Sequence, residues 1–173
     1  MPSRLRVPVG YLLGIVVLAL AHPVPASLVA GGAIALVGEA LRVWASGHID
    51  KTRALATGGP YAHTRNPLYL GSLVMAIGVA LAAASPWAAL AVAAYLAAFY
   101  PSVMREEAAF LRARFPPEYT AWAADVPPFL PRLTPAGPRA TSFAWELVAR
   151  NREWRAALAL PALAALLWVR GLL

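Results

Sequence analysis

The chain has 173 residues, of which 60% are hydrophobic and only 13% are charged, and its mean hydropathy is +0.61. Soluble domains carry about 25% charged residues, so the composition indicates a membrane protein. The length suits a single domain that spans residues 1–173. The absence of cysteine excludes disulfides, thiolate metal sites and cysteine nucleophiles.

Five apolar segments follow one another along the chain, at 7–21, 27–46, 67–85, 86–104 and 156–173. A helix needs roughly 20 residues to cross the hydrocarbon core of a bilayer, so the first and last segments are slightly short. Only a Ser-Pro break separates the third segment from the fourth, which predicts an antiparallel helical hairpin. We therefore expect an all-α fold, an integral-membrane helical bundle of about five transmembrane helices.

The basic residues predict how the bundle is oriented. If the N-terminus is cytoplasmic, all 15 Lys and Arg residues except Arg42 and Arg170 fall in the N-terminal tail, in 47–66 or in 105–155, on the inner side. This distribution follows the positive-inside rule. We expect a bacterial inner-membrane protein whose N-terminus and active site are cytoplasmic. Its net charge of +7 then faces the anionic headgroups of the lipid bilayer, and no compact domain remains to bind nucleic acid.

The longest polar stretch, 105–155, is expected to form a cytoplasmic cap of short helices and loops. It begins with a helical pattern, breaks at Pro116-Pro117, where proline can begin a new helix, and continues into the proline-rich "VPPFLPRL". The later stretch "SFAWELVARNREWR" alternates apolar and basic residues. It is expected to be an interfacial helix that leads into the last span, so that 141–173 forms a C-terminal unit.

Glu39 and Arg42 lie inside the second apolar segment, three residues apart and therefore on one helical face. Charges within a membrane span are costly, so such a pair faces the bundle interior. Two interpretations stay open: the pair fixes helix packing, or it lines a polar cavity or substrate portal. The three histidines have no spacing typical of a metal site, and no metal is expected. His63 remains a candidate substrate residue and base.

The segment "TGGPYAHTRNPLYLGS", 57–72, places a compact polar motif directly before the third apolar segment. Pro67 suits the first turn of a helix, and Asn66 is expected to cap it. The free N–H groups of a helix start attract anions, and Arg65 adds a forked donor for a carboxylate. Tyr61 and Tyr69 flank this cap and are expected to sandwich a flat ring of a ligand or to line the pocket for it. The alternative is that they belong to an interfacial aromatic belt.

Two blocks, "GGPYAHTRNPLYLGS" and "REEAAFLRARFPPEYTAWAADVPPFLPRL", resemble those of the integral-membrane methyltransferases related to isoprenylcysteine carboxyl methyltransferase, a group that includes the phospholipid N-methyltransferases. The resemblance covers roughly 46–133, in the family's order and spacing, with the two blocks at the matching ends of a helical hairpin. This chain departs from the pattern at Pro116, where the family has glycine. It also has Val103 where the family has a substrate-orienting arginine.

The resemblance implies a cytoplasmic pocket for S-adenosylmethionine, with S-adenosylhomocysteine as the product. Carried over by position, Glu107 holds the methionine end of the cofactor near the reaction centre, and Arg105 is the nearest candidate for the orienting arginine. The implied cofactor-binding residues are Arg53, Ala54, Leu55, Ala56, Tyr61, Arg65, Asn66, Pro67, Leu68, Tyr69 and Glu107. Glu39, Arg42 and His63 are the candidates for substrate binding.

The expected methyl acceptor is a lipid or lipidated small molecule, with a carboxylate as its reacting group, as in isoprenylcysteine carboxyl methylation. Phospholipid or thiol methylation is the alternative within the same class. From other classes, an NADPH-dependent membrane reductase of the steroid-reductase type and a non-enzymatic scaffold stay open. The oligomeric state is open too, because Gly31, Gly32 and Gly38 suit either packing inside the bundle or a dimer interface.

Overall fold

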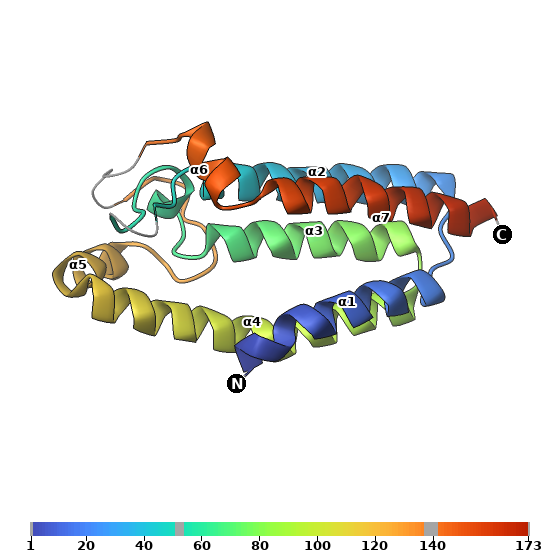
Figure 1. The fold of residues 1–173 in the computed structure, drawn as a ribbon, viewed down its shortest axis with the longest axis horizontal. Coiled ribbons are helices and arrows are strands. Elements are labelled where there is room, and N and C mark those ends of the chain that lie inside the picture. The colour runs from blue at the N-terminus through green and yellow to red at the C-terminus, as the bar shows by residue number, and fades with distance from the viewer. Residues whose placement is uncertain (1, 51–53, 137–141, 173) are drawn as a thin grey trace.

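A computed structural model describes residues 2–50, 54–136 and 142–172, and this part of the chain is helical with no strand. This confirms the predicted all-α fold (Figure 1). The elements in chain order are α1 (Pro2–Leu20), α2 (Pro25–Ser46), the 3-10 helix η1 (Gly59–Ala62), α3 (Pro67–Ala83), α4 (Pro86–Arg114), α5 (Pro116–Asp125), α6 (Trp145–Arg150) and α7 (Trp154–Leu172).

The helices α1, α2, α3, α4 and α7 run along the length of the molecule (Figure 1). α2, α4 and α7 are long and apolar enough to cross a membrane, and shorter apolar helical stretches lie at Leu5–Leu20 and Pro67–Ala83. α3 lies between the pair α2 and α7 and the pair α1 and α4. Large apolar side chains such as Tyr11, Val29 and Trp87 are exposed on the outside of the bundle. So large an apolar surface fits contact with lipid.

Proline is the first residue of α2, α3, α4 and α5, at Pro25, Pro67, Pro86 and Pro116, where its missing N–H costs no hydrogen bond. The Ser-Pro break forms the predicted hairpin. The Ser85 hydroxyl accepts a hydrogen bond from the backbone N–H of Ala88, 3.3 Å away, and so caps α4. The hairpin turn therefore comes from local sequence signals.

Two boundaries differ from expectation. The fourth span continues as α4 to Arg114, beyond its predicted end at Met104 and with Pro101 inside the helix, and it ends just before Pro116, which begins α5. The predicted interfacial helix is instead two pieces. α6 ends at Arg150, and Arg152, with φ of 59°, turns the chain before α7 begins at Trp154.

Glycines let the backbones of α2 and α3 approach closely. A Cβ atom on Gly78 would lie 2.5 Å from both the Ala35 nitrogen and the Gly31 oxygen, and one on Gly38 would lie 2.5 Å from the Met75 nitrogen. Small residues at a helix interface are a usual means of packing in membranes, where lipid supplies no hydrophobic drive. Gly31 and Gly38 thus pack inside the bundle, whereas a Cβ on Gly32 would meet nothing within 4 Å.

The cap lies at the end of the bundle opposite the α3–α4 turn (Figure 1). Backbone hydrogen bonds join the loop between η1 and α3 to the proline-rich segment after α5: Arg65 N–H donates to Pro127 O (2.9 Å) and Arg132 N–H to His63 O (3.0 Å). The Thr64 hydroxyl, which is buried, also donates to Phe129 O (2.8 Å). These bonds bring the two sequence blocks of the motif side by side.

We expect Gly78→Ala to destabilise the bundle by about 1–3 kcal/mol, because the added methyl group must push α2 and α3 apart. Equilibrium unfolding of the detergent-solubilised chain measures this. Gly32→Ala is the matched control, since its methyl group enters open space. Equal stability of the two variants would contradict the close-packed α2–α3 interface.

Candidate functional site

A cavity of about 650 Å³, here called the cap cavity, opens where η1, the start of α3, the end of α4 and α5 meet. The volume lies within the range of about 300–1,000 Å³ that is usual for small-molecule sites. It brings together many of the residues singled out from the sequence: Arg42, Ala54, Leu55, Ala56, Tyr61, Arg65, Asn66, Leu68, Tyr69 and Glu107.

Other predicted site residues lie elsewhere. Pro67, Arg105, Glu39 and His63 are not among the residues that line the cap cavity. Arg105 is exposed on α4, and His63 Nδ1 lies 2.8 Å from Arg132 O, where it helps to hold the proline-rich segment. Arg53 falls outside the described residues.

Tyr61 and the buried α5 residues form one wall of the cavity. The indole N–H of Trp122 donates to the backbone oxygen of Tyr61 (3.0 Å), and Tyr119 packs edge-on against Trp122 with ring centroids 5.7 Å apart. Burial, and then the negative charge of Glu107, raises the pKa of the Tyr61 hydroxyl well above its usual range. Tyr61 therefore stays protonated at neutral pH and can donate a hydrogen bond.

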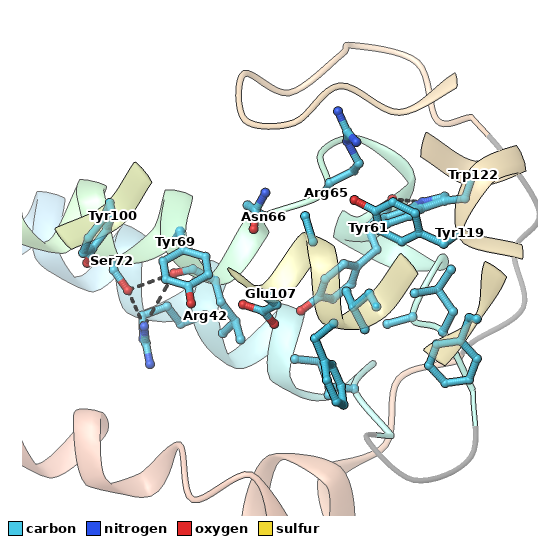
Figure 2. Close-up of a pocket in the computed structure, with 18 of the residues that line it drawn as sticks. Arg42, Tyr61, Arg65, Asn66, Tyr69, Ser72, Tyr100, Glu107, Tyr119 and Trp122 are labelled. Carbon is cyan, nitrogen blue, oxygen red and sulfur yellow. Dashed lines mark hydrogen bonds between the residues drawn. The ribbon is translucent and has the colours of Figure 1, made fainter. Parts of the chain in front are cut away.

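Glu107 extends from the part of α4 that continues beyond the predicted span. Figure 2 shows its carboxylate between the side chains of Tyr61 and Tyr69, with Asn66 nearby. The residue is exposed to solvent through the open cavity. A carboxylate in this position can neutralise a cationic group of a ligand, and the two phenols add hydrogen-bond donors on either side.

The loop before α3 differs from expectation at Asn66. It occupies the N-cap position of α3, but its side chain makes no cap hydrogen bond. The Asn66 amide instead donates to Pro128 O (2.7 Å), because the proline-rich segment lies against this loop. The adjacent Arg65 lines the cavity, and its Nε is buried with no hydrogen-bond partner in the described part of the chain. Such a donor favours an acceptor from a ligand.

Arg42 lies at the membrane side of the cavity and is held by several partners. Its guanidinium meets the Glu153 carboxylate at 2.6 Å, and it donates to the hydroxyl of Ser72, which in turn donates to Leu68 O (2.9 Å). Glu39 lies at 4.0 Å from Arg42. Arg42 thus joins α2, α3 and the residue just before α7, and it also lines the cavity, whereas Glu39 does not line it.

Several cavity residues carried no signal strong enough to single them out in the sequence. Arg6 comes from the first turns of α1, Tyr95 and Tyr100 from the middle of α4, and Trp122 from α5. The two tyrosines within an otherwise apolar span were the available hint. A sequence pattern does not reveal that the N-terminal end of α1, with Arg6, lies beside these tyrosines.

Replacing Glu153 by Ala is expected to reduce stability by about 1.5–3 kcal/mol, since the partly buried Arg42 guanidinium loses its charged partner. Thermal or denaturant unfolding in detergent provides the measurement. The control is Arg150→Ala, which removes a pair with Asp50 in which the Arg150 side chain is 54% exposed, and about 0–1 kcal/mol is expected there. A larger loss for Arg150→Ala than for Glu153→Ala would be inconsistent with this geometry.

Comparison with known proteins gives a family and distant relatives. The family model for phospholipid methyltransferase matches residues 26–118. Over 106 residues, or 60% of this chain, the sequence is 36% identical to the cobalt-zinc-cadmium resistance protein CzcN of Cupriavidus metallidurans and covers 47% of it. It is also 36% identical, over 106 residues, to the nickel-cobalt-cadmium resistance protein NccN of Alcaligenes xylosoxydans xylosoxydans, of which it covers 48%.

The chain thus spans about half the length of the curated relatives it matches. No solved structure matches it. The family match runs from the start of α2 into α5 and includes the hairpin, the loop before α3 and Glu107. Because that match covers more than half of the chain, this membrane protein belongs to the phospholipid methyltransferase family.

Proposed function

We propose that the chain is an integral-membrane methyltransferase that moves a methyl group from S-adenosylmethionine to a lipid or lipidated small molecule. The acceptor group that best fits is a carboxylate, and the site faces the cytoplasm. The observation that carries this proposal is the cap cavity. There Glu107 lies near Tyr61, Tyr69 and the loop at Asn66. Glu107 belongs to one of the two sequence blocks that resemble the methyltransferases, and the other three residues belong to the other block.

The residues of the cavity fit the charges of this cofactor. S-adenosylmethionine carries a carboxylate, an ammonium and a sulfonium, together with a flat adenine ring. The unpartnered Nε of Arg65 suits the carboxylate, and Glu107 suits the cationic groups. The apolar and aromatic wall suits the ring. This wall consists of Ala54, Leu55, Ala56, Leu68, Phe115, Tyr119 and Trp122.

The bound cofactor supplies a methyl carbon on a positively charged sulfur. With the cofactor bound, a lone pair of the acceptor would form the new bond to that carbon, the carbon–sulfur bond would break with its electrons kept by sulfur, and S-adenosylhomocysteine would be left. The negative carboxylate of Glu107 would attract a cationic group of the cofactor, and the neutral Tyr61 hydroxyl would donate a hydrogen bond beside it. Correct positioning of two reactants contributes about 7–11 kcal/mol to lowering such a barrier.

The cavity continues from the cap toward the membrane-spanning helices. Tyr69, Ser72 and Tyr100 line its inner part and lie on α3 and α4. A lipid-tailed acceptor can therefore place its head in this inner part of the cavity while its tail stays among apolar helices. A carboxylate needs no proton removed, whereas an amine or thiol loses one, for which Glu107 is the nearest base. His63 does not line the cavity and is less suited to that task.

The acceptor class and the role of Glu107 are tested together. Membranes from cells that produce the full chain are incubated with methyl-labelled S-adenosylmethionine and extracted with organic solvent. We expect label in the organic phase, and a loss of at least about tenfold for Glu107→Gln, because a charged hydrogen-bonding partner is removed.

Glu106→Gln is the matched control, since the neighbouring Glu106 is exposed and does not line the cavity. Label that enters only water-soluble products would count against a lipid acceptor. Equal transfer by the Glu107 variant and the wild type would remove Glu107 from the site.

A further inference from the structure

The part of the cap cavity nearest the membrane contains an arginine to which the proposed function assigns no group of the cofactor. Arg6 from α1 lies there with Tyr69, Tyr95 and Tyr100, and we call these four residues the arginine end of the cavity. The Tyr95 hydroxyl donates to the backbone oxygen of Arg6 (3.0 Å), which holds the start of α1 against α4. The rings of Tyr69 and Tyr100 pack edge-on, with centroids 5.4 Å apart.

Arg6 lines this end of the cavity together with three phenol groups. It interacts electrostatically with the hydroxyls of Tyr69, Tyr95 and Tyr100. No carboxylate within the described ranges forms an ion pair with Arg6. A half-buried guanidinium at a membrane-facing cavity, with phenols and no counter-charge, is suited to an oxyanion.

The other charges that line the cavity are already matched. Arg42 has Glu153 at 2.6 Å, and Asp50 has Arg150 at 2.9 Å. This leaves Arg65 and Glu107 for the cofactor's carboxylate and cationic groups under the proposed function. Arg6 then remains as the cation that the cofactor does not neutralise.

The position of Arg6 relates it to the reacting group. The Tyr69 hydroxyl interacts with both Arg6 and Glu107, so it links Arg6 to the part of the cavity that holds Glu107. An anion held by Arg6 would therefore lie on the side of Tyr69 that faces away from Glu107, within the same cavity. Arg6 lies outside the family-matched residues 26–118, and it is a different residue from Arg105, the candidate for substrate orientation that the family resemblance implied.

We propose that Arg6, with Tyr69, Tyr95 and Tyr100, forms an anion subsite that selects amphiphilic methyl acceptors with a negatively charged oxyanion head. This inference rests on the proposed function, because it assigns the acceptor of that same reaction. It makes Arg6 a specificity-determining residue supplied by α1, a helix that the family pattern does not cover.

The test compares two amphiphiles that differ only in charge, N-dodecanoylglycine and its neutral primary amide. The full chain is placed in phosphatidylcholine nanodiscs, and dissociation constants are measured by calorimetry for wild type, Arg6→Gln, Arg6→Lys and Arg155→Gln. Arg155 is exposed on α7 and outside the cavity, so its variant controls for surface charge. S-adenosylhomocysteine is titrated into every sample.

We expect the anionic amphiphile to bind wild type more tightly than the amide. Arg6→Gln should raise the dissociation constant of the anionic amphiphile by roughly tenfold or more, because a charge-assisted hydrogen bond is lost. The dissociation constant of the amide should stay within about twofold of the wild-type value. Arg6→Lys should restore part of the difference, and Arg155→Gln should have no effect. Unchanged affinity for S-adenosylhomocysteine in Arg6→Gln shows that the variant is folded.

Equal binding of the two amphiphiles by wild type, or binding of neither, would overturn the subsite. So would competition by added phosphatidylglycerol, because Arg6 would then hold an ordinary anionic membrane lipid. Failure of wild type to bind S-adenosylhomocysteine would count against the proposed function separately, and the charge comparison would still decide whether Arg6 binds an anion.

Discussion

Hydrogen bonds between the loop before α3 and the proline-rich segment after α5 are the constraint on which the cap cavity depends. The buried Thr64 and the backbones of His63 and Arg65 connect to residues 127–132. This places Tyr61 beside Trp122 and holds the N-terminal end of α3 opposite Glu107 on α4. Buried backbone groups that lost these partners would be costly, so the cavity wall and the loop form one unit.

A second constraint sits where the cap meets the bundle. The glycines of α2 and α3 allow a close backbone approach, and this brings Arg42 to the inner side of the cavity. Glu153, which comes just before α7, then reaches Arg42 and ties the last helix to α2 and α3. The C-terminal part of the chain, although outside the family-matched residues, thus helps to position a residue of the candidate site.

Local signals predicted most of the fold and half of the site. Apolar segment lengths and the prolines at 67, 86 and 116 mark the helices and the hairpin, and the motif blocks indicated Tyr61, Tyr69 and Glu107. Signals that depend on distant contacts were missed. Asn66 pairs with Pro128 rather than capping α3, and the backbone of Arg152, with φ of 59°, separates α6 from α7. The place of Arg6 depends on α1 lying along α4, which no residue near Arg6 indicates.

The central claim is that the cap cavity holds a sulfonium cofactor. The most direct test is calorimetric titration of the purified, detergent-solubilised chain with S-adenosylmethionine, and in a parallel sample with NADPH. The account predicts saturable one-to-one binding of S-adenosylmethionine and none of NADPH. Binding of NADPH without binding of S-adenosylmethionine would contradict it and favour a reductase.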